Sequence, residues 1–155
     1  LAECEKIIAN LKAGYPQLSL WQDVVKRQAK VRRYRETWLG RRRYLPGIVS
    51  DDWGKKSFAE RCAMNTPIQG TAADILKLVL GRLIVELPDY PWLRPLLQIH
   101  DELVFELPAD KVEEAAALIR SYMEAQPFPE FDVPIVAEAA FGPSFGELAE
   151  MEVAR

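Results

Sequence analysis

Residues 96–106 have the sequence LLQIHDELVFE, in which three polar residues separate two apolar runs. Apolar runs of this kind predict the two strands of a β-hairpin. Hairpin turns normally contain Asn-Gly or another glycine-bearing pair, whereas this junction contains His100, Asp101 and Glu102. A tight turn here would hold Asp101 at the tip of two buried strands, which is a rigid mount for a carboxylate that binds a divalent cation. A short polar turn with no further role is the alternative interpretation.

A second informative segment lies upstream, where residues 60–75 have the sequence ERCAMNTPIQGTAADI and an apolar helical pattern continues to about Leu87. The spacing predicts one helix from about Ser57 to Asn65 and another after it. Pro67 removes a backbone donor and Gly70 loosens the chain. We therefore expect a kinked or broken pair of helices.

Three polar side chains near this break have the spacing of one helix face. Asn65 and Gln69 would turn outward, and Arg61 lies one turn earlier on the same side. From the residues alone, the ordinary interpretation is a helix C-cap for Asn65 and a surface position for Gln69.

The charge distribution is uneven, although the formal net charge is only −3. Residues 26–43 contain nine basic residues and one acidic residue, whereas residues 101–155 contain thirteen acidic and three basic residues. A dense basic run predicts contacts with nucleic-acid phosphates. A solvated helix face rich in lysine and arginine is the alternative.

The remaining pattern predicts further helices and strands. Helices are expected over residues 1–13 and from a cap at Ser19 toward Tyr34. A short hairpin is expected over residues 36–45, around Gly40-Arg41.

The chain after Leu87 alternates between strands and a helix. A loop over residues 88–95 leads into the hairpin at 96–106, and a helix capped near Asp110 follows it. Residues 133–139 predict a last strand, with a proline near its start where a missing N–H is tolerated. Antiparallel strands with helices on one face make an α+β fold.

Three segments together resemble the family A, or bacterial polymerase I-like, DNA polymerases. They are residues 40–46 (GRRRYLP), residues 60–75 and residues 96–106, and their order and spacing match that family. The resemblance extends from Trp21 to about Phe145. It implies template-directed nucleotidyl transfer in DNA replication or repair.

The resemblance also implies an architecture. The expected fold is α+β, with an antiparallel palm sheet and a motif-bearing β-hairpin packed against helices, plus N-terminal helices from the fingers region. Residues 1–155 would be the C-terminal part of the catalytic domain. About 1–50 would form fingers-side helices and a basic hairpin, and about 51–155 the palm portion.

The acidic turn receives its roles from the same resemblance. Asp101 is expected to be one of two invariant metal-binding aspartates, and Glu102 the adjacent catalytic carboxylate. The implied cofactor is Mg²⁺ in a two-metal site, only partly supplied by this chain, because hard oxygen ligands suit magnesium. His100, the only histidine in the chain, would lie beside the primer terminus.

The resemblance implies DNA contacts at two further places. Arg61, Asn65 and Gln69 match residues that reach the minor groove, where donors test the geometry of a base pair without reading its sequence. Arg41, Arg42 and Arg43 fit contacts with the DNA backbone. The expected partners are therefore primer-template DNA and, in a complete enzyme, deoxynucleoside triphosphates.

Two family features are absent from these 155 residues. One is the motif Asp-Tyr-Ser-Gln-Ile-Glu with the other catalytic aspartate, and the other is the fingers helix that binds the incoming triphosphate. We therefore expect the chain to be a C-terminal fragment of a longer polymerase. The fragment alone should be inactive, and its partner would be the missing N-terminal part of the enzyme. Loss of the strand beside the Asp101 hairpin should expose an edge or apolar face, so self-association of the fragment is also expected.

Two short segments depart from the family pattern. Asp51-Asp52-Trp53 and Lys55-Lys56 occupy a region that usually contains an asparagine and an arginine. Lysine replaces a planar fork with a point charge, so a bidentate contact is not expected there. Residues 142–145 end in phenylalanine where the family commonly has tryptophan.

The apolar runs and the cysteines indicate the cellular compartment of the protein. No apolar run approaches the roughly 20 residues that cross a bilayer, and the first residues show no signal-peptide pattern. Cys4 and Cys62 lack metal-ligand spacing, which favours reduced thiols. These features predict a soluble cytoplasmic protein without a membrane partner. The family resemblance implies that it is bacterial or phage-like and associated with the nucleoid.

Two other functions remain open from the sequence. A free-standing, non-catalytic DNA-binding remnant would keep the basic run but have no use for Asp101. A metal-dependent phosphohydrolase would need further carboxylate or histidine ligands near Asp101, and the chain has one histidine.

Overall fold

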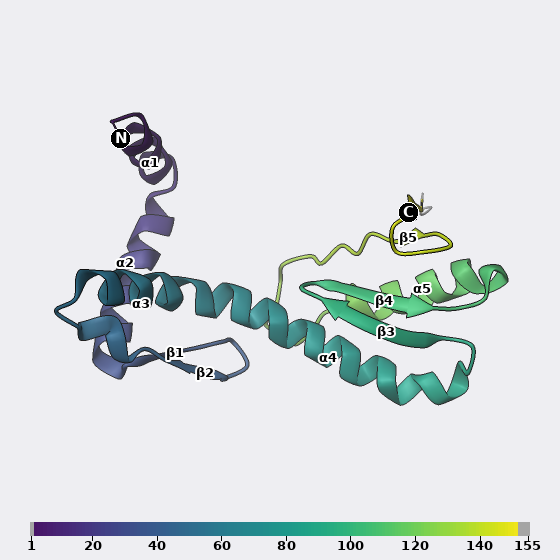
Figure 1. Ribbon diagram of the computed structural model, residues 1–155. Coiled ribbons are helices and arrows are strands. Elements are labelled where there is room, and N and C mark those ends of the chain that lie inside the picture. The colour runs from purple at the N-terminus through teal and green to yellow at the C-terminus, as the bar shows by residue number, and fades with distance from the viewer. Residues whose placement is uncertain (1, 152–155) are drawn as a thin grey trace. The chain divides into compact units, whose positions relative to one another are not determined.

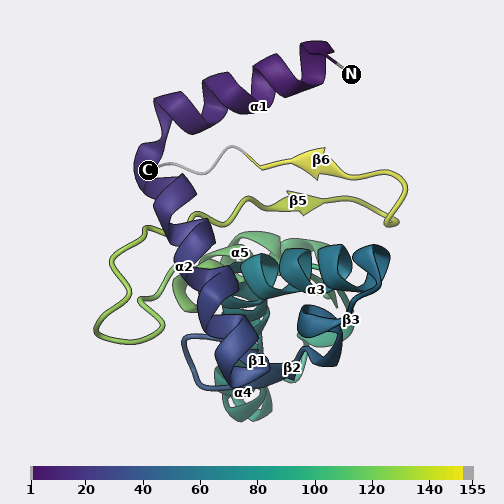
Figure 2. The same ribbon diagram turned by 90° about the vertical axis from the view of Figure 1, so that its left-hand side faces the viewer.

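The structure is a computed structural model, and it describes residues 2–151. The chain divides into two units, with the boundary after Ala72, and each unit is described by itself. Within the described residues, helices alternate with three two-stranded antiparallel sheets, an α+β fold as predicted (Figures 1 and 2). The described part contains no helix long and apolar enough to cross a membrane.

The first unit begins with two helices, α1 (Ala2–Gly14) and α2 (Pro16–Arg32). The first agrees with the predicted helix over residues 1–13, of which Leu1 lies outside the described residues. The predicted start of the second at Ser19 is wrong. Pro16 occupies the first turn of α2, because the fixed φ of proline suits the start of a helix.

A short hairpin follows α2, as expected, and we refer to residues 34–44 as the basic hairpin. Its strands are β1 (Tyr34–Glu36) and β2 (Arg42–Tyr44), so the first strand lies a few residues before its predicted place. The turn between them uses Gly40 at φ 85°, a left-handed conformation that glycine adopts without a steric penalty.

The core of the first unit lies between α2, the 3₁₀ turn η1 (Pro46–Val49) and α3 (Trp53–Asn65). Val25 and Ile48 are 2% and 0% exposed in this core. The predicted start of α3 near Ser57 is wrong, because the Asp52 side chain accepts a hydrogen bond from Lys55 N at 3.0 Å and caps the helix earlier.

A kinked or broken pair of helices was expected after α3, and the structure shows no break. A π-helical turn, η2 (Thr66–Gly70), connects α3 directly to α4 (Thr71–Glu86), and the chain stays helical throughout. The Thr66 and Thr71 hydroxyls each donate to the carbonyl four residues earlier at 2.6 Å. Thr66 begins the turn and Thr71 follows it, and Pro67 within the turn donates no backbone hydrogen bond.

The second unit contains most of α4, the 3₁₀ turns η3 (Leu87–Asp89) and η4 (Ala109–Lys111), and α5 (Val112–Met123). It also contains the predicted hairpin, with strands β3 (Arg94–Ile99) and β4 (Glu102–Glu106). Buried residues of this unit come from α4, α5, the segment before β3 and the segment after α5. They include Leu83, Leu93 and Ala115.

The hairpin strands are not buried as the sequence suggested. Leu96 and Leu97 in β3 are 54% and 57% exposed, and within the described residues β3 pairs with β4 alone. The expected exposed apolar face is therefore present.

The predicted strand over residues 133–139 is wrong. Those residues form no strand, and the short strands β5 (Ala140–Phe141) and β6 (Ala149–Glu150) pair instead. Val133 and Val136 remain exposed, while the Ala137 N–H donates to the Glu124 carboxylate at 2.9 Å. A side-chain acceptor thus replaces a strand partner at this position.

Candidate nucleic-acid interface and acidic turn

The nine candidate residues are all exposed, but they divide between the two units. The first unit holds the six expected DNA contacts other than His100, and the second holds the acidic turn, residues 100–102. In the first unit they are Arg41, Arg42, Arg43, Arg61, Asn65 and Gln69.

The acidic turn is a two-residue hairpin connection. Ile99 pairs with Glu102, which leaves His100 and Asp101 as the two turn residues. His100 has φ 54°, and positive φ in such a turn matches the twist of the paired strands. Asp101 therefore stands at the tip of the hairpin, as predicted, with its carboxylate exposed.

The ligand chemistry of the acidic turn suits one part of a magnesium site. Asp101 and Glu102 offer exposed carboxylate oxygens, the donor type that Mg²⁺ prefers. Among residues 2–151, no group of three or more His, Cys, Asp or Glu side chains is placed to hold an ion. The turn fits a cation whose other ligands come from water, substrate phosphates or other residues.

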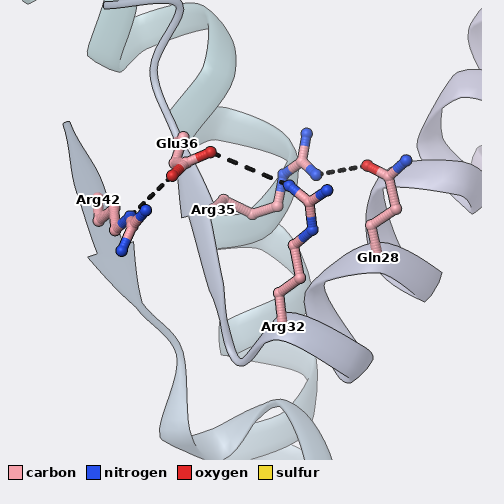
Figure 3. Close-up of polar contacts among 5 residues, drawn as sticks. All are labelled: Gln28, Arg32, Arg35, Glu36 and Arg42. Atoms are coloured by element: carbon pink, nitrogen blue, oxygen red, sulfur yellow. Dashed lines mark hydrogen bonds and ion pairs between the residues drawn. The ribbon is translucent and has the colours of Figure 1, made fainter. Parts of the chain in front are cut away.

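The basic hairpin is organised by one acid, Glu36, which was not among the predicted site residues. Arg42 Nε donates to Glu36 Oε1 at 2.7 Å, and Arg32 Nη1 lies 4.0 Å from Glu36 Oε2 (Figure 3). Beside them, Arg35 Nη1 donates to Gln28 Oε1 at 2.7 Å. The signal in the sequence was a single acid within a run of nine bases.

The pKa values of these arginines shift in opposite directions. The hydrogen bond that Arg42 donates to Glu36 is the largest cause that raises the pKa of Arg42, and the Arg42 guanidinium also lies 4.7 Å from the centre of the Tyr34 ring. Burial, followed by the charge of Arg32, lowers the pKa of Arg35.

The three consecutive arginines have different surroundings. Arg41 Nη2 donates to the Gly70 carbonyl at 3.0 Å, and Arg42 binds Glu36. The side chain of Arg43 makes no hydrogen bond or ion pair within residues 2–151. Arg43 therefore offers the most available charge for an external phosphate.

The helical candidates lie on α3 and its π-turn. Arg61 Nη1 donates to Ser57 Oγ at 2.9 Å, and its guanidinium carbon lies 5.9 Å from the centre of the Phe58 ring. Asn65 ends α3, and Gln69 is inside η2. A π-turn is uncommon and often occurs at a functional site.

This chain belongs to the DNA polymerase family A. The model of that family, described as DNA polymerase family A, matches residues 1–147. The chain is similar to a thermostable DNA polymerase I of Thermus filiformis, at 39% identity over 145 residues that cover 90% of this chain and 16% of that protein. It is 40% identical to DNA polymerase I of Geobacillus stearothermophilus, over 92% of this chain and 16% of that protein.

A solved structure supports the same relationship. The POL domain of Pol1 from M. smegmatis, in complex with DNA primer-template and dNTP, matches with a TM-score of 0.74 and 36% identity. The match covers 84% of this chain and 24% of that chain. The sequence thus corresponds to a minor part of its relatives' length.

Proposed function

We propose that this chain is the C-terminal part of a DNA-directed DNA polymerase and supplies one metal-binding aspartate and contacts to primer-template DNA. Family membership and the M. smegmatis complex, which contains primer-template and dNTP, support this proposal. The observation that carries it is the two-residue turn that presents Asp101 between two paired strands. In this proposal, about 1–50 belong to the fingers side and about 51–155 to the palm.

Asp101 would hold a Mg²⁺ ion, with Glu102 as the adjacent supporting carboxylate. When bound, two such ions supply charge stabilisation for the transferring phosphoryl group. Pairing of Ile99 with Glu102 limits the conformations of the turn. Asp101 would therefore lose little conformational entropy when it binds the metal ion during each nucleotide addition. His100 would lie beside the primer terminus.

Arg61, Asn65 and Gln69 would donate to minor-groove acceptors near the growing base pair. Those acceptors occur on every correct pair, so exposed donors on one helical segment can monitor geometry without sequence preference. The arginines of the basic hairpin, above all Arg43, would contact backbone phosphates.

The 155-residue chain alone should not extend a primer, because it supplies one carboxylate turn and no cluster of metal ligands among residues 2–151. Its proposed partner is the preceding part of the polymerase. The exposed face with Leu96 and Leu97 is the proposed place for that partner or, in its absence, for a second copy of the fragment.

The test is single-nucleotide incorporation by the complete polymerase that contains this sequence. Asp101→Asn should slow incorporation by about a hundredfold or more while primer-template binding persists, since it removes a charged metal ligand. Asp110→Asn, the same change at an exposed position in η4, is the control and should leave the rate unchanged. Normal incorporation by Asp101→Asn would refute the proposed role.

One observation favours the DNA-binding alternative. The hydrogen bonds and ion pair that hold Arg32, Arg35 and Arg42 all have their partners within the first unit. If the native protein were only a binding module, Asp101→Ala would leave DNA affinity unchanged or raise it, and no polymerase reaction would depend on that residue. The incorporation assay therefore separates the two functions.

A further inference from the structure

The turn of the basic hairpin is bound directly to the π-turn. The Trp38 N–H donates to Thr71 Oγ1 at 2.9 Å, immediately after the π-turn, and Arg41 Nη2 donates to the Gly70 carbonyl at 3.0 Å. All of these residues belong to the first unit. Two elements with expected DNA contacts, the hairpin arginines and the helical donors, are therefore joined by hydrogen bonds.

Thr71 is central to this connection because its hydroxyl has two roles. It donates to the Pro67 carbonyl at 2.6 Å and accepts from Trp38 N, and the residue is 5% exposed. Thr66 provides a natural comparison, since its hydroxyl makes the same bond to the carbonyl four residues earlier at 2.6 Å and the residue is 6% exposed. In the described part of the chain, the Thr66 hydroxyl makes no hydrogen bond to the hairpin.

Gly70 makes the close approach possible. A Cβ atom built on Gly70 would lie 2.6 Å from Thr37 Cγ2, closer than side chains tolerate. Thr37 is itself 5% exposed, and its Oγ1 accepts from Arg41 N at 3.1 Å, so it has little freedom to move. The absence of a side chain at Gly70 thus leaves room for the Thr37 side chain of the hairpin turn.

We infer that Thr71 and Gly70 are positioning residues that fix the basic hairpin on the π-turn, so that its arginines and the helical donors meet one DNA duplex as a preformed surface. The inference rests on the proposed function for its partner, primer-template DNA. Its energetic basis is preorganisation, because a hairpin already held in place loses less conformational entropy when its arginines bind phosphates.

The experiment compares Thr71→Val with Thr66→Val in the 155-residue chain. Both variants remove a buried hydroxyl that donates to the carbonyl four residues earlier. Only Thr71→Val also removes the acceptor of the Trp38 N–H in the hairpin. Thr71→Ser keeps the hydroxyl and tests rescue. Thr71→Ala gives a second hydroxyl-free variant in case valine prevents folding.

Two readouts are used. The first is hydrogen exchange of the Trp38 amide, which should accelerate in Thr71→Val and Thr71→Ala and remain slow in Thr66→Val and Thr71→Ser. The second is affinity for a primer-template duplex as a function of salt. Thr71→Val should weaken binding about fivefold, the ratio that corresponds to one net hydrogen bond. Its salt slope should fall by about one, the contribution of one phosphate contact.

The outcomes separate this inference from the proposed function. Equal effects of Thr71→Val and Thr66→Val on Trp38 exchange and on the salt slope would overturn the inference, because a purely structural role affects both variants alike. Failure of the wild-type chain to bind duplex DNA would count against the proposed function, while Trp38 exchange would still decide whether Thr71 fixes the hairpin.

Discussion

Glu36 and Arg42 are direct partners across the basic hairpin, and Arg42 Nε donates to Glu36 Oε1 at 2.7 Å. Arg32 approaches the second oxygen of the same carboxylate at 4.0 Å. A phosphate that binds these arginines must therefore compete with an internal carboxylate. Glu36 both orders the hairpin and reduces its positive charge.

Replacement of this acid should strengthen DNA binding. We expect Glu36→Gln to raise the affinity for duplex DNA and to steepen its salt dependence by about one, because one negative charge leaves the cluster and Arg42 becomes available to a phosphate. Fluorescence anisotropy at several salt concentrations measures both effects. The control is Glu114→Gln in α5, which removes an acid paired with Lys111 at the same 2.7 Å. Equal gains in both variants would show that net charge alone is responsible.

Replacement of Gly70 and of Gly81 by alanine should change the free energy of unfolding in opposite directions. Gly70→Ala should lower the free energy of unfolding by about 1–3 kcal/mol, since the added methyl group meets the buried Thr37 side chain. Gly81 lies inside α4, and a Cβ there would have no neighbour within 4 Å. Gly81→Ala should therefore raise stability by about 0.5–1 kcal/mol through helix propensity. Urea denaturation distinguishes the two, and a stabilising Gly70→Ala would contradict the close approach.

The cap of α3 should depend on one of two adjacent aspartates. Asp52 accepts a hydrogen bond from Lys55 N at 3.0 Å, so Asp52→Ala should cost about 1 kcal/mol of stability. Asp51→Ala is the neighbouring control and should have little effect, because Asp52 is the cap residue of this helix. Thermal unfolding followed by circular dichroism measures both, and equal losses would indicate a general effect of charge.

The backbone at His100 should favour residues that tolerate a left-handed conformation. His100 has φ 54°, so His100→Val should destabilise the hairpin by roughly 1–2 kcal/mol, whereas His100→Gly should not. Hydrogen exchange of the β3 and β4 amides reports this local stability. If His100→Gly keeps the hairpin intact and still impairs primer extension in the complete polymerase, the imidazole has a role beyond the turn.

Some elements could be predicted because their determinants are local. The turn at His100 and Asp101 follows from two adjacent apolar strands with polar residues between them, and the structure confirms it. The helix after Pro108 was also predictable, since its apolar spacing and acidic first turn lie within a single segment. The α+β class follows from these elements.

Other elements depended on contacts that periodicity does not reveal. Residues 133–139 have a strand composition, but a strand needs a paired neighbour, and the Ala137 amide is bound by Glu124 instead. The helix was expected to kink or break near Pro67, because the pattern could not show that a π-turn would continue it past the proline.

The candidate site shows the same division. Asp101 and the hairpin arginines could be selected by residue type and family resemblance, and their proposed roles remain predictions. The contact of Thr71 with Trp38 joins residues 33 positions apart, so no local pattern reveals it. The role of Glu36 was hidden for a different reason, since a lone acid in a basic run looks like a minor reduction of charge.

The π-turn also changes the direction in which side chains point around the helix axis, beginning with the residues of the turn itself. In an α-helix with 3.6 residues per turn, each step of four residues advances by about 40° around the axis, so Arg61, Asn65 and Gln69 would spiral gradually away from one line. Gln69 lies inside the turn Thr66–Gly70, so the step from Asn65 to Gln69 follows a wider winding than that of an α-helix. Because the winding changes between Asn65 and Gln69, these two side chains do not have the regular spacing of an α-helix face.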